Sequence, residues 1–390
     1  LESNLITFVT GLLKVSEEDV LYAMKDMMSK EQIKIEEREE IATIDGKTEL
    51  QIQEWVYLID YYKTELNIAR QIHGLEQASN IKRISNFNNE LEKVEKSSNL
   101  KLSDKQKEAI KLINENNVCI ITGGPGTGKT TIIKTIIDIY KSKGKKVVLC
   151  APTGRAAKRM TEATGEEAKT LHRLLEIGKV FEEKPDPDMD VTPIDGDVVV
   201  IDEISMVDIF LMNYVVKALF KGTKLVLVGD TDQLPSVGPG CVLKDFIDSK
   251  QIPCVKLNKI FRQAMQSKII VNSHKVNEGI NFLQEKEENK NELNDFIFEE
   301  ERNSAEIVNK ILKEYSLDKQ IITPSKKGDL GTKNLNKLIQ EKFNPLNVMK
   351  NEKKFGEVIF REGDKVMQTK NNYDIMWRRD SEISSGIFNG

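Results

Sequence analysis

The sequence predicts an α/β fold in which short apolar strands alternate with helices around a parallel sheet. Four runs carry this prediction, at residues 117–124, 145–152, 197–203 and 224–230, and each is nearly continuous in Val, Ile and Leu. Such runs are typical of strands that helices bury on both faces. The first run enters a glycine-rich loop and the last two end in acidic residues. Because ligands bind at the carboxyl ends of parallel strands, the chemistry is expected there.

Composition indicates a soluble globular protein of more than one domain. A chain of 390 residues is too long for one compact core, and 39% hydrophobic with 31% charged residues is not a disordered composition. Four cysteines without paired metal spacing fit the reduced thiols of a cytoplasmic protein. No run is long enough to span a membrane, so we expect no membrane partner. The net charge of −4 decides nothing about nucleic acid, because local patches bind phosphate.

Residues 1–75 are expected to form a small α+β module that resembles a winged helix. Ser16 and Asp19 form a capping signal before a helix, and QIKIEER and EWVYLI alternate as strands do, with IDGKTEL between them as a turn. An unspecialised α+β cap explains this pattern equally well. Residues 76–100 are expected to be a helical linker.

Two α/β units are expected after the linker. Residues 101–255 would form the first and contain the four apolar strands. Residues 256–390 would form a second, incomplete unit. In it we expect a strand over 319–325, a helix from about Asn334, and a strand within FREGDKVMQT.

A phosphate-binding loop is expected where GGPGTGKT follows the first strand and opens a helix. Gly123, Gly128, Lys129 and Thr130 occupy the defining positions of G-x-x-x-x-G-K-[ST]. The glycines let backbone N–H groups turn toward phosphate, and the helix N-terminus adds positive potential. We expect Lys129 to reach the terminal phosphates and the Thr130 hydroxyl to bind Mg²⁺. The expected nucleotide contacts are Gly124, Pro125, Gly126, Thr127, Gly128, Lys129, Thr130 and Thr131.

Polar side chains follow two further strands of the predicted sheet. Asp202 suits the Mg²⁺ shell, and Glu203 suits a general base that deprotonates the attacking water. The alternative is a strand that simply ends in acids. Gln233 follows the fourth strand and could sense the γ-phosphate, although a polar loop that turns at Pro235 would look the same.

Six segments, in this order, resemble superfamily-one DNA helicases: GGPGTGKT, APTGRAAKRM, KTLHRLL, VVVIDEISMVD, GDTDQLPSVGPG and IFRQA. Within that superfamily the chain looks like the RecD-type branch, which includes stand-alone RecD-like helicases and the exonuclease V alpha subunit. The resemblance covers about residues 102–390. It implies two RecA-like domains, ATP and Mg²⁺ as cofactors, and 5′→3′ movement on single-stranded DNA in repair or recombination.

The resemblance also implies two further nucleotide contacts. Gln106 matches the glutamine that recognises adenine, although Ser103 and Gln106 also form a capping box for the next helix. Arg262 matches an arginine that approaches the γ-phosphate, and a planar, permanently charged group suits that task. The alternative for Arg262 is a surface ion pair.

The resemblance places single-stranded DNA along three segments. Lone histidines are more often structural than functional, and only the position of His172 in its segment supports a role. Such contacts would be independent of base sequence and sensitive to salt. A junction of single and double strands is a further candidate partner, and protein partners stay unknown. The implied DNA contacts are Pro152, Thr153, Gly154, Arg155, Thr170, His172, Thr323, Ser325 and Lys326.

The resemblance stops at GIFNG, which in the family lies partway through the second RecA-like domain. A small barrel and a segment with a second arginine are expected to follow it. We therefore expect a fragment that binds ATP but hydrolyses it poorly, because hydrolysis requires both domains to close. The alternative function is another nucleic-acid-dependent P-loop ATPase, either RNA-acting or a translocase that does not unwind. Nuclease activity is not expected, because no additional acidic cluster is present.

Overall fold

The computed structural model describes residues 1–44, 47–79, 82–98, 101–177, 186–261, 265–281, 283, 295–368, 372–379 and 382–387. By packing, the chain divides into two compact units, Leu1–Met265 and Gln266–Gly390. Among the helices within these ranges, none is long and apolar enough to cross a membrane.

The N-terminal part of the first unit is a helix pair followed by a hairpin. Helices α1 (Glu2–Leu13) and α2 (Glu17–Ser29) precede the antiparallel strands β1 (Ile33–Ile44) and β2 (Lys47–Leu58). Ser16 and Asp19 form the capping box at the start of α2, so the expected capped helix and hairpin are confirmed. The strands are longer than expected, because β2 includes most of the segment predicted as a turn.

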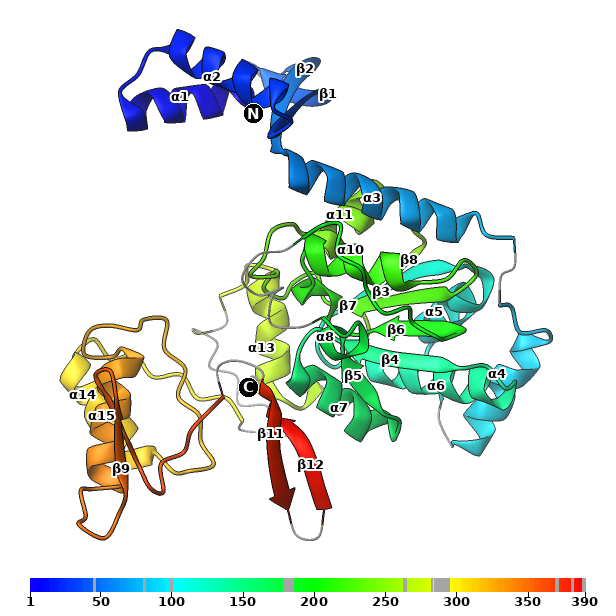
Figure 1. Cartoon of the computed structure of the whole chain (residues 1–390). Helices are drawn as coiled ribbons and strands as arrows, with labels where there is room; N and C mark the ends of the chain where they lie inside the picture. The colour runs from blue at the N-terminus through cyan, green and yellow to red at the C-terminus, as the bar shows by residue number, and fades with distance from the viewer. Residues whose placement is uncertain are drawn as a thin grey trace. The chain divides into compact units, whose positions relative to one another are not determined.

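Helix α3 (Ile59–Glu76) packs in the core of the α/β domain. Figure 1 shows it lying along α10 (Ile209–Ala218). The Asn67 Nδ2 amide donates to Asn213 Oδ1 over 2.6 Å, and the Tyr61 ring meets the Phe210 ring edge-on at 5.4 Å between centroids. At the end of α3, the Asn117 amide donates to the carbonyls of Leu75 and Ala78. The next helix, α4 (Phe87–Ser97), packs against α6 (Lys129–Ser142).

The centre of the first unit is a six-stranded parallel sheet in the order β5-β4-β6-β7-β3-β8. The predicted RecA-like parallel sheet is therefore confirmed. Its strands are β3 (Val118–Gly123), β4 (Val147–Ala151), β5 (Ala168–Thr170), β6 (Val198–Ile201), β7 (Lys224–Gly229) and β8 (Cys254–Leu257). Its helices are α5 (Asp104–Glu115), α6 (Lys129–Ser142), α7 (Gly154–Thr164), α8 (Leu171–Leu174), α10 and α11 (Val242–Ser249), with a 3₁₀ turn η1 (Ile204–Met206).

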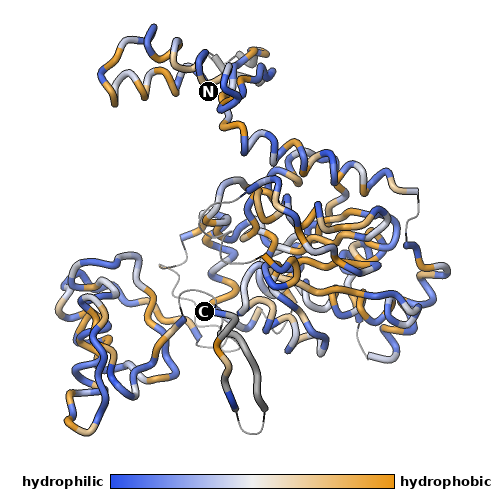
Figure 2. Tube along the Cα trace, in the orientation of Figure 1, coloured by the Kyte–Doolittle hydropathy of each residue, from blue (hydrophilic) through white to orange (hydrophobic). Residues whose placement is uncertain are grey.

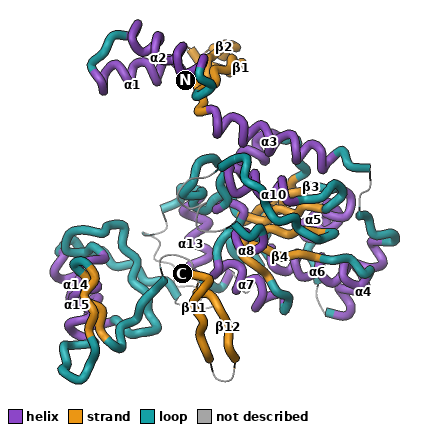
Figure 3. Tube along the Cα trace, viewed as in Figure 1, coloured by secondary structure: helices purple, strands orange, loops and turns teal. Residues whose placement is uncertain are grey.

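Successive strand residues alternate between two apolar cores, one on each face of the sheet. In β6, for example, Val199 and Ile201 join one core, whereas Val198 and Val200 join the other. Figure 2 shows the hydrophobic strands at the centre, and Figure 3 shows helices on both sides of them. This double burial explains why the strands are continuously apolar and not alternating.

The second unit contains helices and two separate hairpins. Helices α13 (Lys268–Asn277), α14 (Ser304–Glu314) and α15 (Thr332–Phe343) are followed by the antiparallel pairs β9 (Glu352–Phe355) with β10 (Val358–Arg361) and β11 (Asn372–Arg379) with β12 (Glu382–Ile387). The helix expected from about Asn334 is confirmed as α15.

Two strand predictions in this unit are wrong. Residues 319–325 form no strand, because side chains there bond to their own loop: Thr323 Oγ1 donates to Leu330 O over 2.7 Å. In the described part of FREGDKVMQT, residues 360–368, only Phe360 and Arg361 are in a strand. Asp364 ends it, since its carboxylate accepts from the Arg361 N–H over 2.7 Å and turns the chain.

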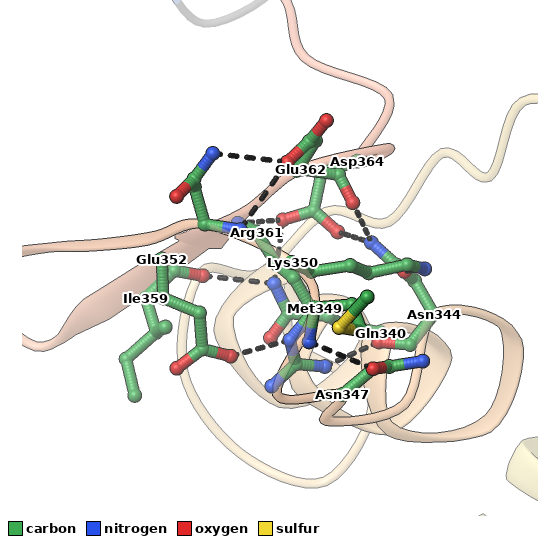
Figure 4. Close-up of polar contacts among 11 residues, drawn as sticks. Gln340, Asn344, Asn347, Met349, Lys350, Glu352, Ile359, Arg361, Glu362 and Asp364 are labelled. Carbon is green, nitrogen blue, oxygen red and sulfur yellow. Dashed lines mark hydrogen bonds and ion pairs between the residues drawn. The ribbon is translucent and has the colours of Figure 1, made fainter.

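A polar network joins α15 to the β9–β10 hairpin, as Figure 4 shows. The Asp364 carboxylate accepts from Gln340 Nε2 at 2.6 Å and from Asn344 Nδ2 at 2.7 Å. Beside it, the largely buried Arg361 guanidinium pairs with Glu352. Charge-assisted hydrogen bonds therefore connect the C-terminal half of α15 to the hairpin.

Candidate active site

The glycine-rich loop between β3 and α6 has the backbone conformation that its sequence predicts. Gly126 and Gly128 have φ values of 75° and 83°, in the left-handed region that favours glycine. A Cβ atom on Gly128 would also lie 2.4 Å from Gln106 Nε2, and one on Gly123 would lie 2.7 Å from Leu257 O. Conformation and close packing therefore both require glycine in this loop.

The loop offers positive potential to an anion. Lys129 is the first residue of α6, and its ammonium group donates to the carbonyl of Gly123 and, over 3.2 Å, to that of Gly124. No described side chain caps the N-terminus of this 14-residue helix, so its first N–H groups can bind phosphate oxygens. Thr130 is exposed beside them.

Two carboxylates follow β6 at the same edge of the sheet. Strand β7 lies between β6 and β3. Burial raises the pKa of Asp202 to about 6, the Glu203 N–H donates to Asp202 Oδ1 over 2.9 Å, and the nearby Lys129 charge partly opposes the shift in the pKa. Glu203 itself has a φ of 54°, which is rare for a residue other than glycine.

Three buried oxygens near these strand ends have no hydrogen-bond partner among the described residues: Thr122 Oγ1, Glu203 Oε2 and Ser205 Oγ. Buried polar atoms normally have partners, so unsatisfied ones indicate a place for a ligand or water. Carboxylate and hydroxyl oxygens suit Mg²⁺, which usually takes only one or two protein ligands together with phosphate and water. Asp202 and Thr130 fit that requirement. Within the described ranges no group of three or more His, Cys, Asp or Glu side chains gathers.

Replacing Asp202 by asparagine should stabilise the ligand-free chain. Because the folded-state pKa is raised to about 6, the buried carboxylate destabilises the fold at neutral pH. The gain in unfolding free energy, about 1–3 kcal/mol, should be complete above pH 6 and vanish as the pH falls toward about 4. Denaturant titrations in EDTA at several pH values measure it. A variant less stable than the wild type at pH 7.5 would contradict this account of the charge.

Gln106 has one of its two expected features, the capping box, and its recognition of adenine stays a prediction. It completes the capping box of α5 with Ser103, and its Nε2 amide lies 3.4 Å from Gly128 O in the loop. The sequence reasoning missed Phe261, whose N–H donates to Gly126 O over 3.2 Å. Its ring also packs against Gly128. Only its place in the IFRQA segment could have indicated it. The adjoining Arg262 lies outside the described residues.

Gln233 lies in an exposed turn after β7. Asp230, which is buried, shapes this turn by accepting from the Asp232 N–H over 3.0 Å. The Gln233 N–H lies 3.4 Å from Asp230 O, and its side chain is open to solvent. The turn therefore follows β7, which lies between β3, the strand before the glycine-rich loop, and β6, the strand before the two carboxylates.

The expected DNA contacts of the first unit lie at the ends of β4 and β5. Thr153 and Thr170 cap α7 and α8, where their hydroxyls accept N–H groups over 3.2 Å. Arg155 is exposed and His172 is partly buried. The two threonine hydroxyls thus already accept a hydrogen bond at a helix start, and each could offer only its proton to a phosphate. The Arg155 side chain is exposed to solvent.

The expected contacts of the second unit gather in one loop. Thr323 and Ser325 donate their hydroxyl protons to carbonyls within that loop, both over 2.7 Å. Lys326 is exposed.

Comparison with known families and proteins gives consistent matches. A family model described as "AAA domain" matches residues 106–239, and one described as "ATP-dependent RecD-like DNA helicase SH3 domain" matches residues 335–390. An SH3 domain is a small β-barrel. We expected a barrel after Gly390, but the match to this barrel family begins at Leu335, so the expected position was wrong.

Similar proteins include helicases from several organisms. The ATP-dependent RecD2 DNA helicase of Deinococcus radiodurans is 35% identical over 70% of this chain and 36% of its own length. The RecBCD enzyme subunit RecD of Buchnera aphidicola is 35% identical over 48% of this chain and 34% of its own. The solved Pif1 helicase of Candida albicans is 28% identical, with a TM-score of 0.31 over 42% of this chain and 41% of that one. This chain spans about a third of the curated relatives' length.

Proposed function

Because this chain belongs to the RecD-like helicases, we propose that it is the ATP-binding part of a motor that moves 5′→3′ along single-stranded DNA and unwinds duplexes. One observation carries the proposal. At one edge of the parallel sheet, a phosphate loop with Lys129 lies near two acids, one of which has a buried, unpartnered oxygen.

ATP is the proposed substrate. Lys129 and the N-terminus of α6 bind its phosphates, while Gln106 contacts the adenine beside Gly128. Asp202 and Thr130 would hold Mg²⁺, which would neutralise charge on the phosphates when bound. Glu203 accepts a proton from the attacking water. The remaining proposed nucleotide contacts are Gly124, Pro125, Gly126, Thr127, Gly128 and Thr131, with Gln233 and Arg262 at the γ-phosphate.

Single-stranded DNA is proposed to follow the ends of β4 and β5. Helix N-termini and an exposed guanidinium at neighbouring strand ends offer donors to backbone phosphates, with no reading of base sequence. The proposed contacts are Pro152, Thr153, Gly154, Arg155, Thr170 and His172 in the first unit and Thr323, Ser325 and Lys326 in the second. The Thr323 and Ser325 hydroxyls would have to turn from the carbonyls of Leu330 and Lys327 to donate to a phosphate.

Strand separation by the full gene product tests this function. The substrates are duplexes with a 5′ single-stranded tail, duplexes with a 3′ tail, and blunt duplexes, each with Mg²⁺ and ATP. Unwinding from the 5′ tail alone is expected, and unwinding from the 3′ tail alone would refute the polarity. Competition between DNA and RNA oligomers of matched sequence distinguishes a DNA motor from an RNA-acting relative. ATP hydrolysis stimulated by DNA without strand separation would indicate a translocase instead.

Replacing Arg155 by alanine should weaken the binding of single-stranded DNA severalfold. If the guanidinium neutralises one phosphate, the slope of log affinity against log salt should fall by about 0.7. Fluorescence anisotropy with labelled oligomers at four salt concentrations measures both effects. Lys146→Ala is the matched control. This residue directly precedes the first residue of β4, and among the described residues its ammonium group pairs only with the exposed carboxylate of Asp195. Equal salt slopes for the wild type, Arg155→Ala and Lys146→Ala would show that Arg155 does not contact DNA phosphate.

A further inference from the structure

We propose that the contact between Gly238 and Asp208 is a positioning device. It holds the Gln233 loop, defined here as residues 230–240, on the segment that follows Glu203. The inference rests on the proposed ATPase function, because it assigns Gly238 and Asp208 the task of fixing Gln233 relative to Glu203.

The contact leaves no room for a side chain. A Cβ atom on Gly238 would lie 2.0 Å from Asp208 Oδ2 and 2.7 Å from its Cγ atom. The carboxylate cannot easily turn away, because its other oxygen, Oδ1, accepts from the Leu211 N–H over 2.8 Å and caps α10. One oxygen therefore holds the helix while the other lies against the loop backbone.

Adjacent residues extend the same contact. The Ile209 N–H donates to Pro239 O over 3.0 Å. Gly240 has a φ of 93°, and a Cβ atom there would lie 2.2 Å from Ile209 Cγ2. The Ser236 hydroxyl lies 3.0 Å from Gly238 O and 3.1 Å from Gly240 O, which keeps the loop in the shape that fits.

The other end of the loop rests on the same segment. Gly229, the last residue of β7, approaches Ile204 so closely that a Cβ atom would lie 2.7 Å from Ile204 Cγ2. Ile204 follows Glu203 directly in the chain. The loop is thus fixed at both ends to residues 204–209, whereas Gln233 between them is exposed.

This arrangement sets the position of Gln233 through its supports. Among the described residues, the Gln233 side chain has no hydrogen-bond partner that would orient it, so its place relative to Glu203 depends on where the loop ends lie. Misplacing a catalytic group by about 1 Å can cost up to about 100-fold in rate. Gly238 and Asp208 are positioning residues, since neither is among the proposed contacts of the nucleotide.

The first test is Gly238→Ala in the full gene product. We expect DNA-stimulated ATP turnover to fall about 10- to 100-fold, with KM for ATP within about threefold of the wild type and a lowered melting temperature that still leaves the protein folded in the assay. Gly74→Ala is the matched control, because a Cβ atom there has no neighbour within 4 Å. Wild-type turnover in Gly238→Ala would overturn the inference.

A double variant separates positioning from a general packing defect. If Gly238 acts through Gln233, then Gly238→Ala with Gln233→Ala should turn over no more slowly than Gln233→Ala alone. Losses that multiply would overturn the inference.

Asp208→Ser decides the question if Gly238→Ala does not fold. Serine keeps the cap of α10 but removes Oδ2 from the loop. Turnover should fall in the wild-type background and stay unchanged in the Gln233→Ala background, and any other pattern would overturn the inference. A wild-type protein without nucleic-acid-stimulated ATPase would instead refute the proposed function, and this inference with it.

Discussion

Lys129→Ala is expected to reduce ATP hydrolysis at least about 100-fold while the first unit stays folded. Among the described residues, its ammonium group bonds only to carbonyls of the loop, so its loss removes the cation from the proposed phosphate site and leaves the apolar cores intact. Steady-state turnover and circular dichroism of the same sample measure the two effects.

The matched control is Lys134→Ala, which removes an exposed lysine from the same helix. It should keep wild-type turnover. A folded Lys129→Ala variant with normal hydrolysis would show that the nucleotide site lies elsewhere.

Glu203→Gln is expected to lower turnover about 10²- to 10⁴-fold and to leave ATP affinity nearly unchanged. The amide has the same shape as the carboxylate but cannot take a proton from water. Glu203 Oε2 is buried and has no hydrogen-bond partner among the described residues, so the substitution should disturb no hydrogen bond of that atom seen there. Turnover and the affinity for a fluorescent ATP analogue separate the two effects.

Glu162→Gln, on the exposed face of α7, is the control for the change in net charge. An equal loss of affinity and turnover in Glu203→Gln would mean that Glu203 binds the nucleotide and does not act as a base. The assignment of the general base would then fail while the nucleotide site remained.

Sequence patterns predicted the first unit well because its structure is local or uniformly buried. Continuous Val and Ile runs predicted β3, β4, β6 and β7, since both faces of the sheet are covered. Ser16 and Asp19 predicted a helix start from chemistry contained within four residues. The glycine-rich loop likewise has its signal and its conformation in the same residues.

Features that depend on distant packing escaped prediction. Phe261 reaches the glycine-rich loop across more than 100 residues of sequence, and the Gly238–Asp208 contact joins two separate segments. In the second unit, KQIITPS has a strand-like composition, but side-chain hydrogen bonds of Thr323 and Ser325 fold it into a loop. Composition alone cannot show which of these competing bonds will form.

Helix α3 has a consequence for how the chain unfolds. Its Ile68, Ile72 and Leu75 side chains belong to the same core as β6 and β7. Its amide protons should therefore exchange with solvent as slowly as those of the sheet, and not at the rate of the small module before it. Cutting the chain after α3 would remove an apolar layer from the sheet domain. It would also remove Leu75 O, which accepts from the buried Asn117 amide, and the Asn67 amide, which donates to Asn213. The independently stable unit thus begins near Ile59, well before residue 101, where the sequence predicted the start of the first α/β unit.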